Sequence, residues 1–94
     1  MSGIDVQSRP ARAPKVRFQI DTLRGDPVLL YPEGLLILNS TAHEIVIRCN
    51  GETTVDGLIR MLHDEYEANE ETLRQDVLET LADLQQRKLI IFST

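Results

Sequence analysis

The residues of this 94-residue chain that most often do chemistry are its two histidines and its one cysteine. His43-Glu44 resembles the start of the zinc-binding motif H-E-x-x-H, in which two histidines four residues apart share one helix face. The position four residues after His43 is Ile47, and His63 lies on another predicted helix. We therefore interpret both histidines as surface helix residues and predict no metal site.

Cys49 is expected near the C-terminal end of a predicted helix. The negative end of the helix dipole raises the pKa of a thiol there and disfavours a nucleophile. A single cysteine also excludes an internal disulfide and any multi-cysteine metal site. We interpret Cys49 as a small core residue.

The remaining polar residues lack the patterns of known active sites. An acyl carrier needs a serine, usually directly after an aspartate, and none of the serines follows one: Ser2, Ser8, Ser40 and Ser93. The acidic runs at 64–67 and 70–71 lack the alternate-residue spacing and the glycine of a calcium loop. The glycines are too far apart for a phosphate-binding loop. The chain is therefore predicted to be neither an enzyme nor a cofactor carrier.

Length and charge narrow the possible partners. A chain of 94 residues with 41% hydrophobic and 4% aromatic residues builds one domain around an aliphatic core. Residues 1–24 carry five basic and two acidic side chains, whereas residues 25–94 carry five basic and thirteen acidic ones. A body with a net charge of −8 disfavours nucleic acid and anionic membrane surfaces as partners. No apolar run has a membrane-spanning or signal-peptide pattern, so a cytoplasmic location is expected.

The hydrophobic pattern predicts an α+β fold: a three-stranded antiparallel sheet followed by a three-helix bundle. Residues 1–15 contain Pro10 and Pro14 and no apolar period, which predicts a disordered arm. Strands are expected at 16–20, 28–31 and 35–38, the last two joined by a tight turn at 32–34. Residues 89–92 are expected to form a short terminal strand or a tail that packs back on the domain.

Helix signals follow the sheet. The first helix is expected to begin at 39–41, where Thr41 and Glu44 have capping-box spacing, and to end at Asn50-Gly51. Thr53 or Thr54 caps the second helix, whose apolar stripe ends at Tyr66. Asn69 or Glu70 opens the third helix. Its apolar stripe comprises Leu73, Val77, Leu78, Leu81 and Leu84.

The strands at 28–31 and 35–38 are apolar at successive positions instead of alternating. An antiparallel sheet in a small domain normally has one solvated face and therefore alternates. Two interpretations stay open. Either the helices and the tail at 89–92 cover both faces, or the sheet has an edge and a groove that accept an added peptide strand.

Residues 16–91 resemble the pyrroloquinoline quinone biosynthesis protein D (PqqD) family. The resemblance is carried by the segments YPEGLLILNSTAHEIVIRCNGETTV and LRQDVLETLADLQQRKLI, in this order and spacing. The chain departs from the family at Asn50, where Asp is common, and at Lys88, where Gly is common before the final Leu-Ile.

The resemblance implies that residues 16–94 form a winged-helix-like peptide-binding domain, the recognition element of a ribosomally made and modified peptide (a RiPP recognition element). Such a domain holds the leader of a precursor peptide as an extra antiparallel strand beside the third strand and against the third helix. It also contacts a radical S-adenosylmethionine enzyme, which cross-links a Glu and a Tyr of the precursor. The implied function is a peptide chaperone, or adaptor, in pyrroloquinoline quinone biosynthesis.

Mapped onto this chain, the resemblance implies a strand edge and a helix wall. The strand edge would comprise Leu35, Leu36, Ile37, Leu38 and Asn39, and the helix wall Asp76, Val77, Thr80, Leu81 and Leu84. For Val77, Leu81 and Leu84 the alternative is plain core packing, which we expect for at least one of them.

Two other functions compete with the adaptor. A winged-helix DNA-binding protein would use the third helix for recognition, but the start of this helix carries three carboxylates and only Arg74 as a cation. A standalone structural module would dimerise through its strand edges. The unpaired apolar edge also predicts a homodimer through the N-terminal strands when no peptide is bound.

Overall fold

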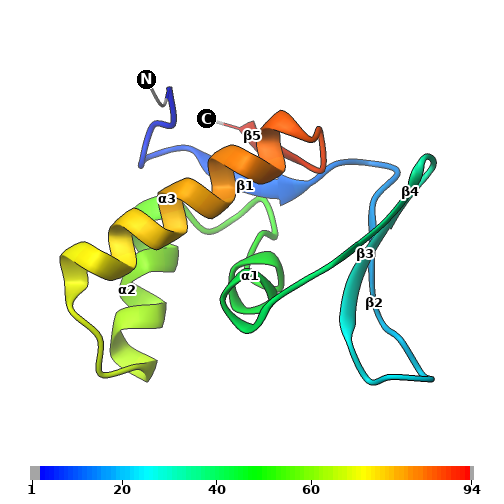
Figure 1. Ribbon diagram of the computed structural model, residues 1–94. Coiled ribbons are helices and arrows are strands. Elements are labelled where there is room, and N and C mark those ends of the chain that lie inside the picture. The colour runs from blue at the N-terminus through cyan, green and yellow to red at the C-terminus, as the bar shows by residue number, and fades with distance from the viewer. Residues whose placement is uncertain (1–2, 94) are drawn as a thin grey trace.

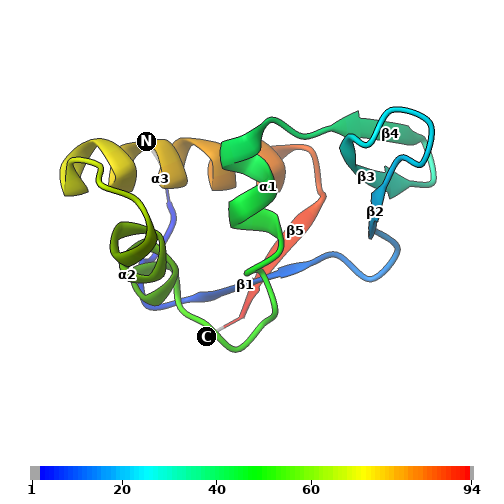
Figure 2. The same ribbon diagram turned by 90° about the horizontal axis from the view of Figure 1, so that it is seen from below.

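The computed structural model describes residues 3–93, in which four strands are followed by three helices and a final strand (Figure 1). In chain order they are β1 (Arg9–Arg12), β2 (Arg17–Ile20), β3 (Pro27–Tyr31), β4 (Gly34–Ile37), α1 (Ser40–Val46), α2 (Val55–Glu65), α3 (Glu70–Gln86) and β5 (Ile90–Ser93). The predicted α+β class is confirmed. Figures 1 and 2 both show α1 between α2 at one end of the molecule and the sheet of β2, β3 and β4 at the other.

The strands form two separate antiparallel sheets. One has the order β2-β3-β4, with Leu29 of β3 lying between Phe18 of β2 and Leu36 of β4. The other pairs β1 with β5. The hairpin turn at 32–34 was predicted correctly, since Tyr31 pairs with Gly34. The predicted three-stranded sheet is present as β2–β3–β4, but the predicted fold lacked the second sheet, which residues near the two ends of the described chain build.

The N-terminal segment is part of the folded domain. The prediction of a disordered arm over residues 1–15 is wrong for β1, which pairs along its whole length with β5; residues 1 and 2 lie outside the described part. Ser8 and Pro10 are buried. The amides of Val55 and Asp56, which begin α2, donate to the carbonyls of Ser8 and Val6 at 3.0 and 2.9 Å. These bonds satisfy helix N-terminal donors that have no partner inside the helix.

Asparagine and threonine side chains cap the N-termini of all three helices in the described range. Asn39 accepts from the amide of Ala42 at 2.8 Å, Thr54 from Gly57 at 3.0 Å, and Asn69 from two amides of the first turn of α3. The expected capping box from Thr41 is therefore wrong, because Asn39 already caps α1. α1 also ends at Val46, before the predicted stop at residues 50 and 51.

The C-terminal end of α3 keeps the left-handed cap despite its lysine. Lys88 has a φ of 64°, a conformation that costs an L-residue energy and favours glycine. Its amide donates to the carbonyl of Gln85, and the amide of Leu89 donates to that of Leu84, both at 2.9 Å. This pair of bonds is a Schellman motif. It turns the chain sharply, so that β5 runs back to pair with β1.

The core is aliphatic, as expected, and comes mainly from the helices. Its fully buried side chains are Leu29, Ile45, Val46, Val55, Leu58, Ile59, Leu62, Val77, Leu81, Leu84, Leu89 and Ile90. Tyr66, placed in the stripe of α2 by the sequence, instead follows the helix and is 45% exposed. No helix within residues 3–93 is long and apolar enough to cross a membrane.

Candidate functional site

Strand β4 is an edge strand of the three-stranded sheet. It pairs with β3 on one side, and no strand of the described chain pairs with its other side. The amide of Leu38 donates to the carbonyl of Pro27 at 2.9 Å, so the main chain of Leu38 faces β3. Because this direction alternates along an antiparallel strand, Leu36 also faces β3, while Leu35 and Ile37 point their N–H and C=O groups outward. The edge therefore offers two outward pairs of hydrogen-bonding groups.

The side chains of the sheet separate into an inner and an outer face. Phe18, Leu29 and Leu36 are cross-strand neighbours on the inner face. α1 covers this face in part, because the ring of His43 stacks on Phe18 with centroids 5.4 Å apart. On the outer face, Leu35 and Ile37 are 55% and 56% exposed. The apolar pattern of this strand thus has two causes: its inner residues face the core, and its outer residues face solvent.

The interpretation in which the C-terminal tail covers the sheet is wrong. β5 pairs with β1 in the other sheet, through register partners that run from Arg9 and Ser93 to Arg12 and Ile90. The outer face at β4 thus remains exposed apolar surface within the described chain. Exposed apolar surface next to an unpaired strand edge is a feature of sites that accept another strand.

A groove of about 310 Å³ lies between β4, the start of α1 and the C-terminal half of α3. Six candidate residues line it: Leu36, Ile37, Leu38, Asn39, Thr80 and Leu84. The structure therefore brings the predicted strand edge and part of the predicted helix wall to one place. The amide oxygen of Asn39 is already engaged in capping α1, which leaves mainly its backbone for a ligand.

The other candidate residues lie elsewhere. Val77 and Leu81 have no exposed surface and are core residues, as we expected for at least one member of the stripe. Asp76 is exposed and lines an adjoining hollow of about 340 Å³ together with Thr41 and Glu44. The side chain of Leu35 lies on the outer face and does not line the groove, although its backbone belongs to the edge.

Sequence reasoning missed three residues that line the groove: Ala42, Glu79 and Asp83. Asp83 belongs to the flank of α3 beside the Val77–Leu81–Leu84 stripe, whereas Glu79 lies farther round the helix and also lines a hollow that contains Arg74. A helix of 3.6 residues per turn places Thr80, Asp76 and Asp83 next to one another on this flank. The signal was therefore present in the sequence: residues at the margin of a core stripe border a groove, while residues at its centre are buried.

A larger hollow of about 520 Å³ lies between the β1–β2 connection and the end of α1. Arg12, Arg17, Phe18 and Cys49 are among its lining residues, and no carboxylate is. Burial raises the pKa of the Cys49 thiol to about 12, and its sulfur donates to the carbonyl of Ile45 at 3.3 Å. Such a thiol is protonated at neutral pH, so this hollow lacks an activated nucleophile.

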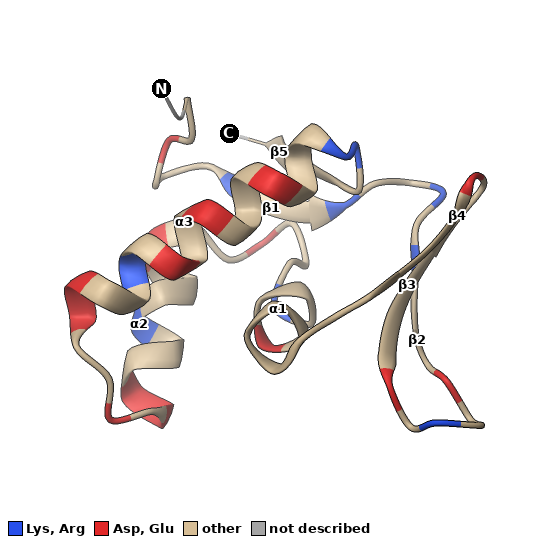
Figure 3. Cartoon of the chain, in the orientation of Figure 1, with Lys and Arg blue, Asp and Glu red and all other residues tan. Residues whose placement is uncertain are grey.

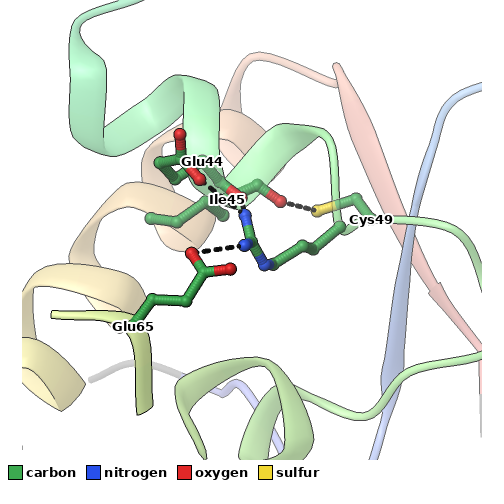
Figure 4. Close-up of polar contacts among 5 residues, drawn as sticks. Glu44, Ile45, Cys49 and Glu65 are labelled. Atoms are coloured by element: carbon green, nitrogen blue, oxygen red, sulfur yellow. Dashed lines mark hydrogen bonds and ion pairs between the residues drawn. The ribbon is translucent and has the colours of Figure 1, made fainter. Parts of the chain in front are cut away.

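An ion-pair network centred on Arg48 links α1 to the end of α2. Arg48 binds the carboxylate and the carbonyl of Glu44, each at 2.8 Å, and the carboxylate of Glu65 at 2.9 Å. Figure 4 shows Glu44 and Glu65 approaching this network from different helices, with the Cys49–Ile45 contact beside it. Among residues 3–93, no three His, Cys, Asp or Glu side chains are grouped so that they could hold a metal ion.

Comparisons with known proteins agree on one family. Residues 27–90 match the family model described as coenzyme PQQ synthesis protein D (PqqD). The chain is 34% identical over 90 residues to a Xanthomonas oryzae pv. oryzae protein named PqqA binding protein, with 96% of this chain and 98% of that protein covered. A protein of the same name from Xanthomonas campestris pv. campestris is 32% identical over 90 residues, and again 96% of this chain and 98% of that protein are covered.

A solved structure has the same fold. It is the solution NMR structure of the PqqD truncation of Methylobacterium extorquens PqqCD, described as a functional, stand-alone RiPP recognition element. The two chains are 27% identical, 96% of each is covered, and the TM-score is 0.80.

Proposed function

The chain belongs to the coenzyme PQQ synthesis protein D (PqqD) family, and from this premise we propose that it binds the PqqA peptide as an added strand on β4. The observation that carries the proposal is the free edge of β4 beside the groove. Leu35 and Ile37 direct their main-chain groups outward, and the groove between β4 and α3 begins at this edge. An extended peptide would pair with these groups and place alternate side chains against α3.

The proposed role is that of an adaptor without catalytic activity. The peptide would be presented to a radical S-adenosylmethionine enzyme, which acts on residues outside the bound segment. Because the precursor of a RiPP is made on ribosomes, the adaptor would meet it in the cytoplasm. The single cysteine supports a binding role over a catalytic one, since burial keeps its thiol protonated at neutral pH.

We also propose that the helices and the β2–β3–β4 sheet form a winged-helix-like arrangement, used here for a peptide and not for DNA. Arg74 is the one cation in the first turns of α3, and its guanidinium lies 3.7 Å from the carboxylate of Asp56. Glu70, Glu71 and Asp76 would face phosphates if this helix entered a DNA groove. Their desolvation and repulsion disfavour nucleic acid.

A homodimer through the N-terminal strands is the remaining proposal. Two copies can pair their β4 edges when no peptide is present, and the exposed Leu35 and Ile37 would then be covered. The dimer and the peptide would compete for one edge. Light scattering with and without PqqA distinguishes them, since PqqA should favour the monomer.

The function is tested by calorimetric titration of the protein with synthetic PqqA from the same genome. We expect one peptide bound per protein chain, with a negative heat-capacity change from burial of apolar surface. An absence of binding at millimolar peptide would refute the proposed function.

A further inference from the structure

The walls of the proposed peptide groove carry carboxylates. Glu79 and Asp83 of α3 line the groove, and Asp76 and Glu44 line the adjoining hollow. No Lys or Arg lines either space in the described chain. Figure 3 shows acidic residues recurring along α3. A peptide in this groove therefore meets negative charge on its helix side.

These carboxylates differ in how far their charge is already neutralised. Glu44 is bound by Arg48 at 2.8 Å, and Asp83 is bound by Arg87 at 3.0 Å. Glu79 instead accepts a hydrogen bond from the neutral amide of Gln75 at 3.3 Å. Within residues 3–93, no ion pair involves Glu79. Of the two acidic residues in the groove, Glu79 keeps the charge available to a ligand.

We propose that the groove selects a basic peptide segment, with Glu79 as the main specificity determinant and Asp83 as the second. This inference rests on the proposed function, because it assumes that the peptide adds to β4. A Lys or Arg on the helix side of the added strand pairs with Glu79. The exposed Asp83–Arg87 pair is weak enough for a second peptide cation to compete with Arg87.

The spacing of the two carboxylates suits an extended peptide. Four residues of helix rise by about 6 Å, which is the axial separation of Glu79 and Asp83. Two residues of strand rise by about 6.7 Å and bring the side chain back to the same face. Cations at alternate peptide positions therefore lie opposite the two carboxylates. The peptide residue between them points to the outer face, where Leu35 and Ile37 favour an apolar side chain.

The expected contribution of Glu79 to PqqA affinity is modest because Glu79 is exposed. A solvent-accessible ion pair contributes little, and reversing one charge replaces attraction by repulsion. We expect Glu79→Lys to weaken PqqA binding about tenfold, which corresponds to about 1.4 kcal/mol. Salt should weaken the wild-type complex more than the variant complex, since screening acts on the attraction that the variant lacks.

The test titrates wild type, Glu79→Lys and Glu79→Gln with PqqA, and with PqqA in which every Lys and Arg is replaced by Gln or by Glu. Glu67→Lys is the matched control, because it makes the same charge change at an exposed residue that lines neither space. We expect the control to change affinity less than twofold, and the Glu-substituted peptide to prefer Glu79→Lys over wild type.

The outcomes separate this inference from the function on which it rests. Equal binding of wild type to PqqA and its Gln-substituted form would overturn the inference and leave strand addition intact. So would equal losses in Glu79→Lys and Glu67→Lys. Failure of the wild type to bind PqqA in any form would instead overturn the proposed function.

Discussion

Replacing Ile37 with proline removes one outward N–H from the edge of β4 with little expected change in the fold. The main chain of Ile37 does not pair with β3, and its side chain is 56% exposed. Proline is tolerated on the outer side of edge strands, and its effect on the preceding residue favours the extended conformation that Leu36 already has. We therefore expect the free energy of unfolding to change by less than about 1 kcal/mol.

Peptide binding should respond far more strongly. The bound peptide would lose one hydrogen bond, and its carbonyl would stay unpaired in a buried position, at a cost of about 1–3 kcal/mol. The proline ring also occupies the space through which the peptide approaches. Together these effects predict a loss of at least about 2 kcal/mol, or roughly thirtyfold in affinity. Calorimetric titration with PqqA measures it, after circular dichroism has shown that the variant folds.

Ile20→Pro is the matched control on the opposite edge of the same sheet. The amide of Asp21 donates to the carbonyl of Asp26, so the neighbouring Ile20 points its own amide away from β3, and its side chain is 44% exposed. This variant loses the same kind of donor at an edge that the peptide does not use. If folded Ile37→Pro and Ile20→Pro bind PqqA equally well, the reasoning about β4 is refuted.

Two further predictions concern stability and the thiol. Lys88→Gly should raise the free energy of unfolding by about 1 kcal/mol, because Lys88 has a φ of 64° and glycine adopts this conformation without strain. Gln86→Gly, in the last turn of α3, should instead lower the free energy of unfolding. Thermal unfolding that finds Gln86→Gly more stable than Lys88→Gly would contradict the left-handed cap. Because burial raises the pKa of Cys49 to about 12 from 9.0, the unfolded state releases its proton first. The free energy of unfolding should therefore fall above about pH 9, by up to about 1.4 kcal/mol per pH unit. Denaturant titrations of wild type and Cys49→Ala from pH 8 to 11 test this, and equal slopes would refute it.

The predictable part of the fold was the part with local signals. Alternation of Val16, Phe18 and Ile20, a tight turn at 32–34 and a regular stripe in α3 are properties of short windows of sequence. β1 has no such signal, because it is held by pairing with β5 and by the amide of Gly51, which donates to the carbonyl of Pro10, both far away in the chain. Its prolines suggested a disordered arm, although Pro10 is buried and pairs with Phe92 of β5.

The candidate site also has a part that the sequence predicts well and a part that it predicts poorly. The edge of β4 was predictable because an apolar strand without alternation is locally visible, and the family resemblance indicated which edge is used. The helix wall was less predictable, since Val77 and Leu81 face the core while Thr80 and Asp83 border the groove. Neighbouring positions on the helix therefore have different roles, and the packing of α3 against α2 and β5 decides which of them are buried.

Amide hydrogen exchange of the free and PqqA-bound protein, resolved by NMR, tests strand addition on β4 most directly. In the free protein, the amides of Leu35 and Ile37 point outward and should exchange faster than that of Leu38, which donates to Pro27 at 2.9 Å. We expect PqqA to protect the amides of Leu35 and Ile37 and to leave those of Phe18 and Ile20, on the opposite edge, unchanged. Protection of Phe18 and Ile20, with Leu35 and Ile37 still exchanging freely, would contradict it.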